Sequence, residues 1–125
     1  MESVGKWGLY QWFEEHGTAL VHPSDVDALR SFRPNGRVFE CIAEDGCFLV
    51  LRYGEAQFRV RPALFKEVPP PKWQIGEAVE VVDAGRWGRV TEIKWHFQRA
   101  EPMYFLSFDG KIAKKRYWSR DLRGY

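Results

Sequence analysis

The sequence predicts a mainly β protein with short N-terminal helices, built from two similar β units in tandem. From Arg37 onward, runs of β-branched and aromatic residues alternate with glycine turns. Three consecutive prolines, in VPPPK at 68–72, interrupt these runs, because proline cannot continue a sheet ladder. A pattern of strand, glycine turn, strand and one helical turn occurs on both sides of this break, at 48–68 and 104–125. The second copy has two extra residues.

Length and composition restrict the class of protein. A chain of 125 residues with 45% hydrophobic residues is long and apolar enough to bury one core or two small ones. It has no apolar run of about 18 residues, and its N-terminus lacks the basic-then-apolar layout of a signal peptide. We therefore expect a soluble protein of the cytoplasm, without a membrane partner.

Two helices are expected before the first β run. The segment KWGLYQWFEEHG, at 6–17, carries aromatic residues at helical spacing (Trp7, Tyr10, Phe13). The segment PSDVDALRSF, at 23–32, predicts a second helix with Ser24 as its N-cap. We expect the first helix to cover one face of the first β unit.

The first β unit is expected over 37–68 and contains a tight hairpin at CIAEDGC. Asp45-Gly46 is a typical two-residue hairpin turn, which would set Glu44 opposite Cys47. In that register Cys41 and Cys47 point to opposite faces of the ribbon. A disulfide needs Cβ atoms that face each other, so we expect both thiols to stay reduced.

The strands expected after the prolines carry a family resemblance. GEAVEVV at 76–82, GRVTEI at 88–93 and YFLSF at 104–108 are followed by two aromatic residues and a DL dipeptide (Tyr117, Trp118, Asp121, Leu122). In this order they resemble an SH3-like small barrel of the KOW or Tudor type. Val90 and Ile93 look buried although strict alternation sends them to opposite faces. Such barrels have a bulge in this strand, so we expect one here.

The resemblance implies two SH3-like barrels in tandem. Residues 1–68 would form a helical N-terminal segment with the first barrel, residues 69–75 a proline-rich linker, and residues 76–125 the second barrel. The whole chain is also similar to small, uncharacterised bacterial proteins that carry WGLYQWFEEHG and HPSDV. This similarity implies a bacterial protein but no activity.

No residue pattern predicts catalysis. None of the three histidines pairs with a cysteine or carboxylate at metal-ligand spacing (His16, His22, His96). In HPSD, at 22–25, Ser24 is better explained as a helix cap than as a nucleophile. No strand–loop–helix context is present for a phosphate-binding loop. We therefore expect no enzyme, no metal site and no cofactor.

Positive charge is concentrated in the second half of the chain. Residues 1–68 hold eight basic and ten acidic side chains, whereas residues 69–125 hold eleven basic and seven acidic ones. The strand expected over 111–118 has basic residues on both faces. Such a strand belongs at the rim of a sheet, where lysines discourage edge-to-edge pairing.

Two kinds of binding remain open, with a purely structural role as a third reading. The leading hypothesis is a non-enzymatic adaptor or regulator, a monomer or weak dimer, that binds another protein through aromatic and arginine residues (Trp87, Arg116, Trp118, Arg120). The alternative is a nucleic-acid-binding module that uses the basic strand (Lys111, Lys114, Lys115, Arg116, Tyr117, Arg123). A net charge of +2 is modest for the second function.

Overall fold

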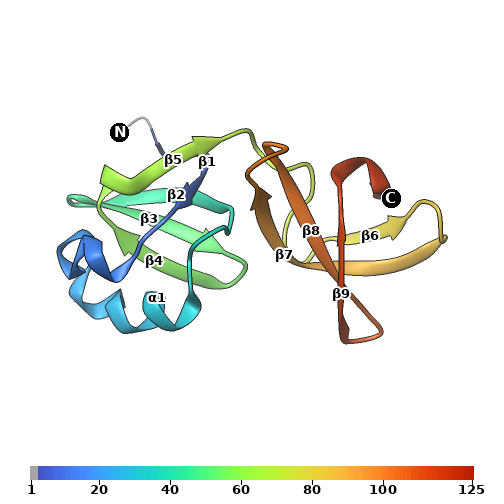
Figure 1. The fold of residues 1–125 in the computed structure, drawn as a ribbon, viewed down its shortest axis with the longest axis horizontal. Coiled ribbons are helices and arrows are strands. Elements are labelled where there is room, and N and C mark those ends of the chain that lie inside the picture. Colours follow the sequence, from blue (N-terminus) through green and yellow to red (C-terminus); the bar gives the residue numbers. More distant parts are fainter. Residues whose placement is uncertain (1–2) are drawn as a thin grey trace. The chain divides into compact units, whose positions relative to one another are not determined.

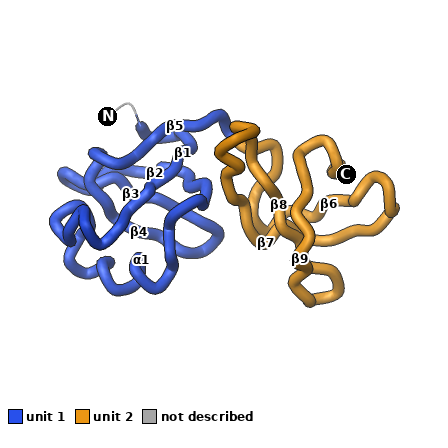
Figure 2. Tube along the Cα trace, in the orientation of Figure 1, with its two compact units in different colours: residues 1–70 blue, residues 71–125 orange. Residues whose placement is uncertain are grey.

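The computed structural model describes residues 3–125 and divides the chain into two compact units, 1–70 and 71–125 (Figure 2). Each unit holds one five-stranded antiparallel sheet (Figure 1). The prediction of a mainly β fold with short helices is confirmed. Within the described residues the pairing leaves both sheets open, with two edge strands each, so no closed barrel is present.

The first unit, residues 1–70, orders its strands β4-β3-β2-β1-β5. Three 3₁₀ turns and one helix lie between β1 and β2, and a fourth 3₁₀ turn precedes β5. The strands are β1 Trp7–Tyr10, β2 Phe39–Asp45, β3 Phe48–Tyr53, β4 Ala56–Val60 and β5 Phe65–Val68, and the other elements are 3₁₀ turns Glu14–His16, Thr18–Leu20, Pro23–Asp25 and Pro62–Leu64 with helix α1 Val26–Phe32.

The N-terminal segment is a strand, so the prediction of a helix over 6–17 is wrong. β1 pairs with β2 on one side and β5 on the other, and this pairing satisfies its backbone groups. Gly8 makes the position of β5 possible, since a Cβ atom there would lie 2.6 Å from the carbonyl oxygen of Lys66. Leu9 and Tyr10 are both buried, so the segment lacks the alternation that marks a half-buried strand.

The second predicted helix is present as α1, and the segment before it lines the edge of β4. The backbone N–H of His22 donates to the Arg59 carbonyl at 2.9 Å, and that of Arg61 donates to the Leu20 carbonyl at 2.8 Å. Ser24 is not a side-chain cap; its backbone N–H donates to Nδ1 of His22. Residues 11–36 therefore form an insertion that covers one edge of the first sheet.

The turn of the hairpin between β2 and β3 lies one residue later than predicted, so Glu44 pairs with Leu49 in place of Cys47. Asp45 pairs with Phe48, so Gly46 and Cys47 form the turn. Gly46 has φ +63° at the first turn position, which only glycine adopts readily. A bulge between Cys41 and Ala43 reduces this difference to one residue, so that Cys41 pairs with Leu51 in place of the predicted Val50. Both cysteines are free, as predicted; Cys41 is buried and Cys47 is exposed.

The second unit orders its strands β10-β6-β7-β8-β9, which is the order of the first unit. A 3₁₀ turn precedes its last strand, as in the first unit. The predicted span of the first copy, 37–68, therefore lacks the first strand of its sheet. The elements are β6 Ala78–Val81, β7 Arg86–His96, β8 Glu101–Phe108, β9 Lys111–Tyr117, the 3₁₀ turn Ser119–Asp121 and β10 Leu122–Arg123.

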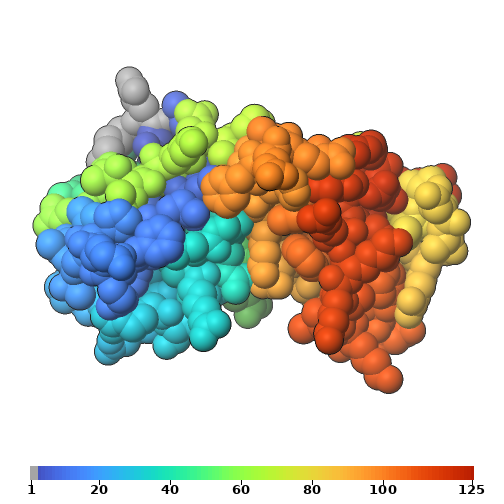
Figure 3. All heavy atoms as spheres, viewed as in Figure 1, coloured from blue at the N-terminus to red at the C-terminus, as the bar shows by residue number. Residues whose placement is uncertain are grey.

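The bulge predicted in β7 is confirmed. The register with β8 shifts between Val90 and Glu92, and Val90 and Ile93 are each only 1% exposed. The extra residue turns the strand so that both side chains enter the core. β9 is an edge strand, as predicted for the basic segment, and in Figure 3 its orange-red residues lie on the visible surface of the second unit.

Part of the expected linker belongs to the second unit. The backbone N–H of Lys72 donates to the Tyr104 hydroxyl at 2.9 Å. Trp73 is buried, and its Nε1 donates to the Ser119 carbonyl at 3.3 Å. Within 69–75, the residues after the prolines therefore pack on the second sheet.

Candidate functional site

Three arginines surround Trp118, which follows β9. The guanidinium carbons of Arg99, Arg116 and Arg120 lie 4.2, 5.2 and 5.8 Å from the centre of its ring. Glu101, at the start of β8, lies among them. We call these five residues the Trp118 cluster. It unites three of the four residues predicted to bind a protein partner.

Two tight turns bring the cluster together. In the β7–β8 turn, Nδ1 of His96 accepts from the backbone N–H of Arg99 at 3.0 Å, and the imidazole ring packs edge-on to Trp118 at 5.4 Å. After β9, the backbone N–H of Trp118 donates to the Asp121 carboxylate at 2.8 Å and starts the 3₁₀ turn that carries Arg120. The sheet order places the β7–β8 turn beside the end of β9.

The cluster carries an excess of positive charge. Oε2 of Glu101 accepts from Nε of Arg99 at 3.1 Å, and Oε1 accepts from Nη1 of Arg120 at 3.2 Å. Within the described part of the chain, Arg116 has no ion pair; its Nη1 lies 3.7 Å from Sδ of Met103. Three guanidinium groups and one carboxylate leave a net charge of +2. Phe97, in the adjacent turn, is 56% exposed.

Trp87 does not join the cluster, because it lies at the start of β7 whereas His96 ends that strand. Nine residues of extended strand span up to about 30 Å. Trp87 instead stacks on Tyr125, with ring centres 4.6 Å apart. The predicted four-residue surface is therefore two surfaces.

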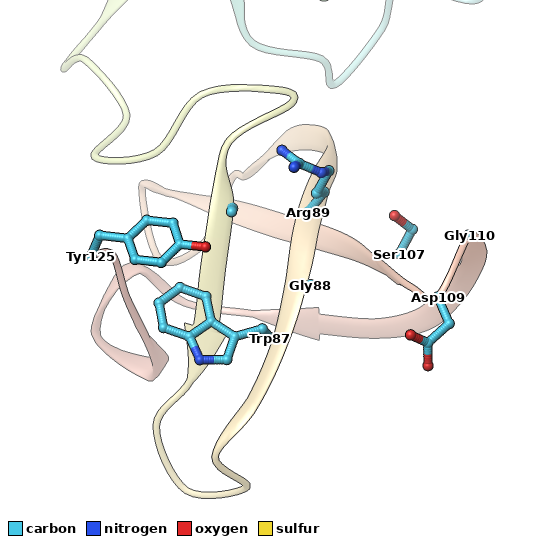
Figure 4. Close-up of a pocket in the computed structure, with 8 residues that line it drawn as sticks. Trp87, Gly88, Arg89, Ser107, Asp109, Gly110 and Tyr125 are labelled. Atoms are coloured by element: carbon cyan, nitrogen blue, oxygen red, sulfur yellow. The ribbon is translucent and has the colours of Figure 1, made fainter.

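The Trp87 surface is a groove of about 450 Å³. Figure 4 shows the two stacked rings on one side of it and the Asp109 carboxylate on the other. Asp109 and Gly110 have φ +52° and +79°, as a two-residue hairpin turn requires. The lining residues are Ala78, Trp87, Gly88, Arg89, Ser107, Asp109, Gly110 and Tyr125.

The residues predicted to bind nucleic acid are only partly available. Tyr117 is buried opposite Tyr104, so its ring is not free to stack on a base. Arg123 forms an ion pair with Glu80. Lys111, Lys114 and Lys115 are exposed on β9, and within residues 3–125 none of them forms an ion pair.

The HPSD residues do not form a catalytic set. The Asp25 carboxylate accepts from the backbone N–H and Nε of Arg59, both at 2.9 Å, and the guanidinium lowers the pKa of this carboxyl. Burial raises the pKa of the Cys41 thiol, which disfavours a reactive thiolate. Among residues 3–125 no group of three or more His, Cys, Asp and Glu residues is placed to hold a metal ion.

Sequence reasoning missed Arg99 and Glu101, because they reach Trp118 through a turn between other strands. A prediction of the β7–β8 hairpin with its neighbour β9 would have located both residues.

Among the helices of the described residues, none combines the length and the apolar character that a membrane span requires.

The fold and these surfaces define a class: a two-unit, mainly β protein whose second unit exposes aromatic and cationic groups. The chain belongs to a family of unknown function, DUF6960, whose model matches residues 1–123. The similarity to an uncharacterised family over the whole chain is thereby confirmed. Comparisons with curated proteins and with solved structures give no match.

Proposed function

We propose that this protein is a non-enzymatic adaptor or regulatory module that binds another protein through the Trp118 cluster. The observation that carries this proposal is one partly exposed indole with three guanidinium groups around it. Tryptophan and arginine are the residues most enriched at the energetic centres of protein interfaces. Exposed Phe97 and half-buried Met103 add apolar contact area beside them.

We also propose that both units are SH3-like barrels in a bacterial cytoplasmic protein. Three shared features support this assignment: the strand order, the bulge in the second strand of each sheet, and the 3₁₀ turn before the last strand. Barrels of this type are used widely as binding modules, although a fold alone does not fix a function.

Affinity capture from an extract of the source cell tests the function. The wild-type chain is expected to retain a partner that Trp118→Ala loses, because truncation of a central interface tryptophan costs about 2 kcal/mol or more, roughly 30-fold in affinity. Trp87→Ala is the matched control, since it removes an exposed indole from the other surface of the same unit. Identical partner sets for wild type and a folded Trp118→Ala variant would overturn the proposal. If that variant does not fold, Arg116→Gln with Arg120→Gln replaces it.

Nucleic-acid binding is the second candidate, and one observation favours it. The five residues 104–108 of β8 pair with the seven residues of β9, so β9 has two residues in excess. The register shift sets Ala113, Lys114 and Lys115 opposite the single residue Leu106. This bulge presents lysines on an uncovered edge. Titration with single- and double-stranded oligonucleotides at two salt concentrations is the test. Binding that weakens steeply with salt and with Lys114→Ala would support this function, and absence of binding at low salt would exclude it.

A further inference from the structure

We infer that the Trp118 cluster binds an acidic segment of its partner, which places a carboxylate on Arg116. This inference rests on the proposed function and names the chemistry of the partner. It comes from an internal comparison: the first unit already holds such a segment at the equivalent arginine.

Arg59 and Arg116 are equivalent residues. Each β hairpin closes with a two-residue turn, between Tyr53 and Ala56 in one unit and between Phe108 and Lys111 in the other. Val50 is the third residue before Tyr53 in β3, and Phe105 is the third residue before Phe108 in β8, so the two hold the same position relative to the turn. Val50 pairs with Arg59, and Phe105 pairs with Arg116. The bulge in β9 therefore takes up the two extra residues and leaves the arginines aligned.

In the first unit, the insertion occupies the edge at Arg59. The backbone N–H of His22 donates to the Arg59 carbonyl, and Val21 forms a bridge with Val60. Three residues further on, the Asp25 carboxylate accepts from the backbone N–H, Nε and Nη2 of Arg59. A short bridge to the edge, followed by a 3₁₀ turn that ends in a carboxylate, thus satisfies both the edge and the guanidinium.

In the second unit, no described segment occupies this place. β9 ends the sheet order, and among the described residues the Arg116 guanidinium contacts the Trp118 ring and the Met103 sulfur of the neighbouring strand β8. Thioether sulfur is a weak acceptor, so most of the five N–H donors of this guanidinium stay available. A planar guanidinium matches a carboxylate with two parallel hydrogen bonds.

The surroundings of Arg116 favour an acidic protein segment over nucleic acid. Three guanidinium groups lie around the Trp118 ring, so little of its face is open for a base to stack. The net charge of the cluster complements a segment with two or more carboxylates. Glu101 already pairs with Arg99 and Arg120, so it competes with the further carboxylates of such a segment for these two guanidinium groups.

A pair of labelled ten-residue peptides tests the inference, one alternating threonine and aspartate, the other threonine and asparagine. Fluorescence anisotropy with the full chain is expected to show binding of the aspartate peptide only. Arg116→Gln should weaken this binding at least tenfold, because a charge-assisted hydrogen-bond pair is lost. Lys111→Gln removes the same charge from the far end of β9 and should change the affinity less than about twofold. Glu101→Gln should tighten binding severalfold.

Three results would overturn the inference: equal binding of both peptides, equal losses in Arg116→Gln and Lys111→Gln, or tighter Arg116-dependent binding of an oligonucleotide. Thermal melting of each variant shows that it is folded. If the acidic peptide fails to bind while the partner captured through Trp118 persists, the inference fails and the proposed function stands. If no partner depends on Trp118, the proposed function itself fails.

Discussion

The two units build the same sheet and finish its outer edge in different ways. β4 has five residues, pairs with β3 without irregularity, and is covered on its outer side by residues 20–22. β9 has seven residues and a bulge, and within the described chain nothing pairs with its outer edge. Lysines and a bulge are two devices that keep an open edge from pairing with other chains. One edge is closed by an insertion, and the other stays open but protected.

A buried tyrosine in each unit shows the same difference between the two units. The Tyr10 hydroxyl donates to the Arg61 carbonyl at 2.7 Å, next to the insertion, and burial raises its pKa far above the ordinary value. The Tyr104 hydroxyl accepts from the backbone of Lys72 and lies 3.3 Å from the Ser119 hydroxyl. One tyrosine therefore anchors the end of the covered edge strand, and the other anchors the segment that enters the second unit.

The largest expected effect comes from adding a methyl group to Gly8 or Gly88. A Cβ atom at Gly8 would meet the Lys66 carbonyl oxygen, and one at Gly88 would meet the Ser107 carbonyl oxygen, each at 2.6 Å. Because backbone cannot move away cheaply, Gly8→Ala and Gly88→Ala should each cost about 3 kcal/mol of unfolding free energy. Hydrogen exchange of β1 and β5, and of β7 and β8, measures the loss in each unit. Unchanged protection in either unit would show that its strands are less tightly packed than the comparison requires.

A smaller loss is expected when the insertion is released from β4. Asp25→Ala removes the acceptor for three donors of Arg59, two of them in its side chain, and should destabilise the first unit by about 1 to 2 kcal/mol, since the pair is partly exposed. Faster exchange of the Arg59 and Arg61 amides, with β2 and β3 amides as reference, measures the opening of the edge. Exchange equal to that of the wild type would mean that the insertion covers β4 without Asp25.

The same tether predicts a pH dependence. The pKa of Asp25 is lowered in the folded chain by the Arg59 guanidinium, so its stabilisation is complete above the unfolded carboxyl value of about 3.9 and is lost as the pH falls through the lower folded value. Thermal melts between pH 2 and 6 should show that Asp25→Asn removes part of the acid destabilisation. Parallel pH profiles for the two chains would contradict this assignment.

The sequence predicted those features that depend on local alternation and failed on those that depend on pairing. The bulge in β7 followed from two apolar residues of opposite parity, Val90 and Ile93, and the rim position of β9 followed from lysines on both faces. β1 was missed because Trp7 to Tyr10 lie in a strand that is paired on both sides and mostly buried, so their side chains do not alternate, and the helical spacing of the aromatic residues arises by chance.

The candidate site could be predicted only in part for the same reason. Trp118, Arg116 and Arg120 lie within five residues of each other, so their proximity is visible in the sequence. Arg99 lies near them only because β7, β8 and β9 are neighbours in the sheet. Trp87 lies far from them because it is at the other end of β7, which is eleven residues long. The sequence showed that the second copy has two extra residues, but only the pairing of β8 with β9 showed that they lie in β9.

The smallest expected effect on stability is the most direct test of the comparison between the two edges. Deletion of Lys114 and Lys115 would pair Ala113 with Leu106 and give β9 the five-residue ladder of β4. Because both lysines are exposed in a bulge, the unfolding free energy of the second unit should change by no more than about 0.5 kcal/mol. The regular edge would then lack its protection, so light scattering should detect self-association that the wild type does not show. A deleted chain that loses its fold would mean that the bulge is structural, and one that stays monomeric would assign the protection of this edge to residues outside the bulge.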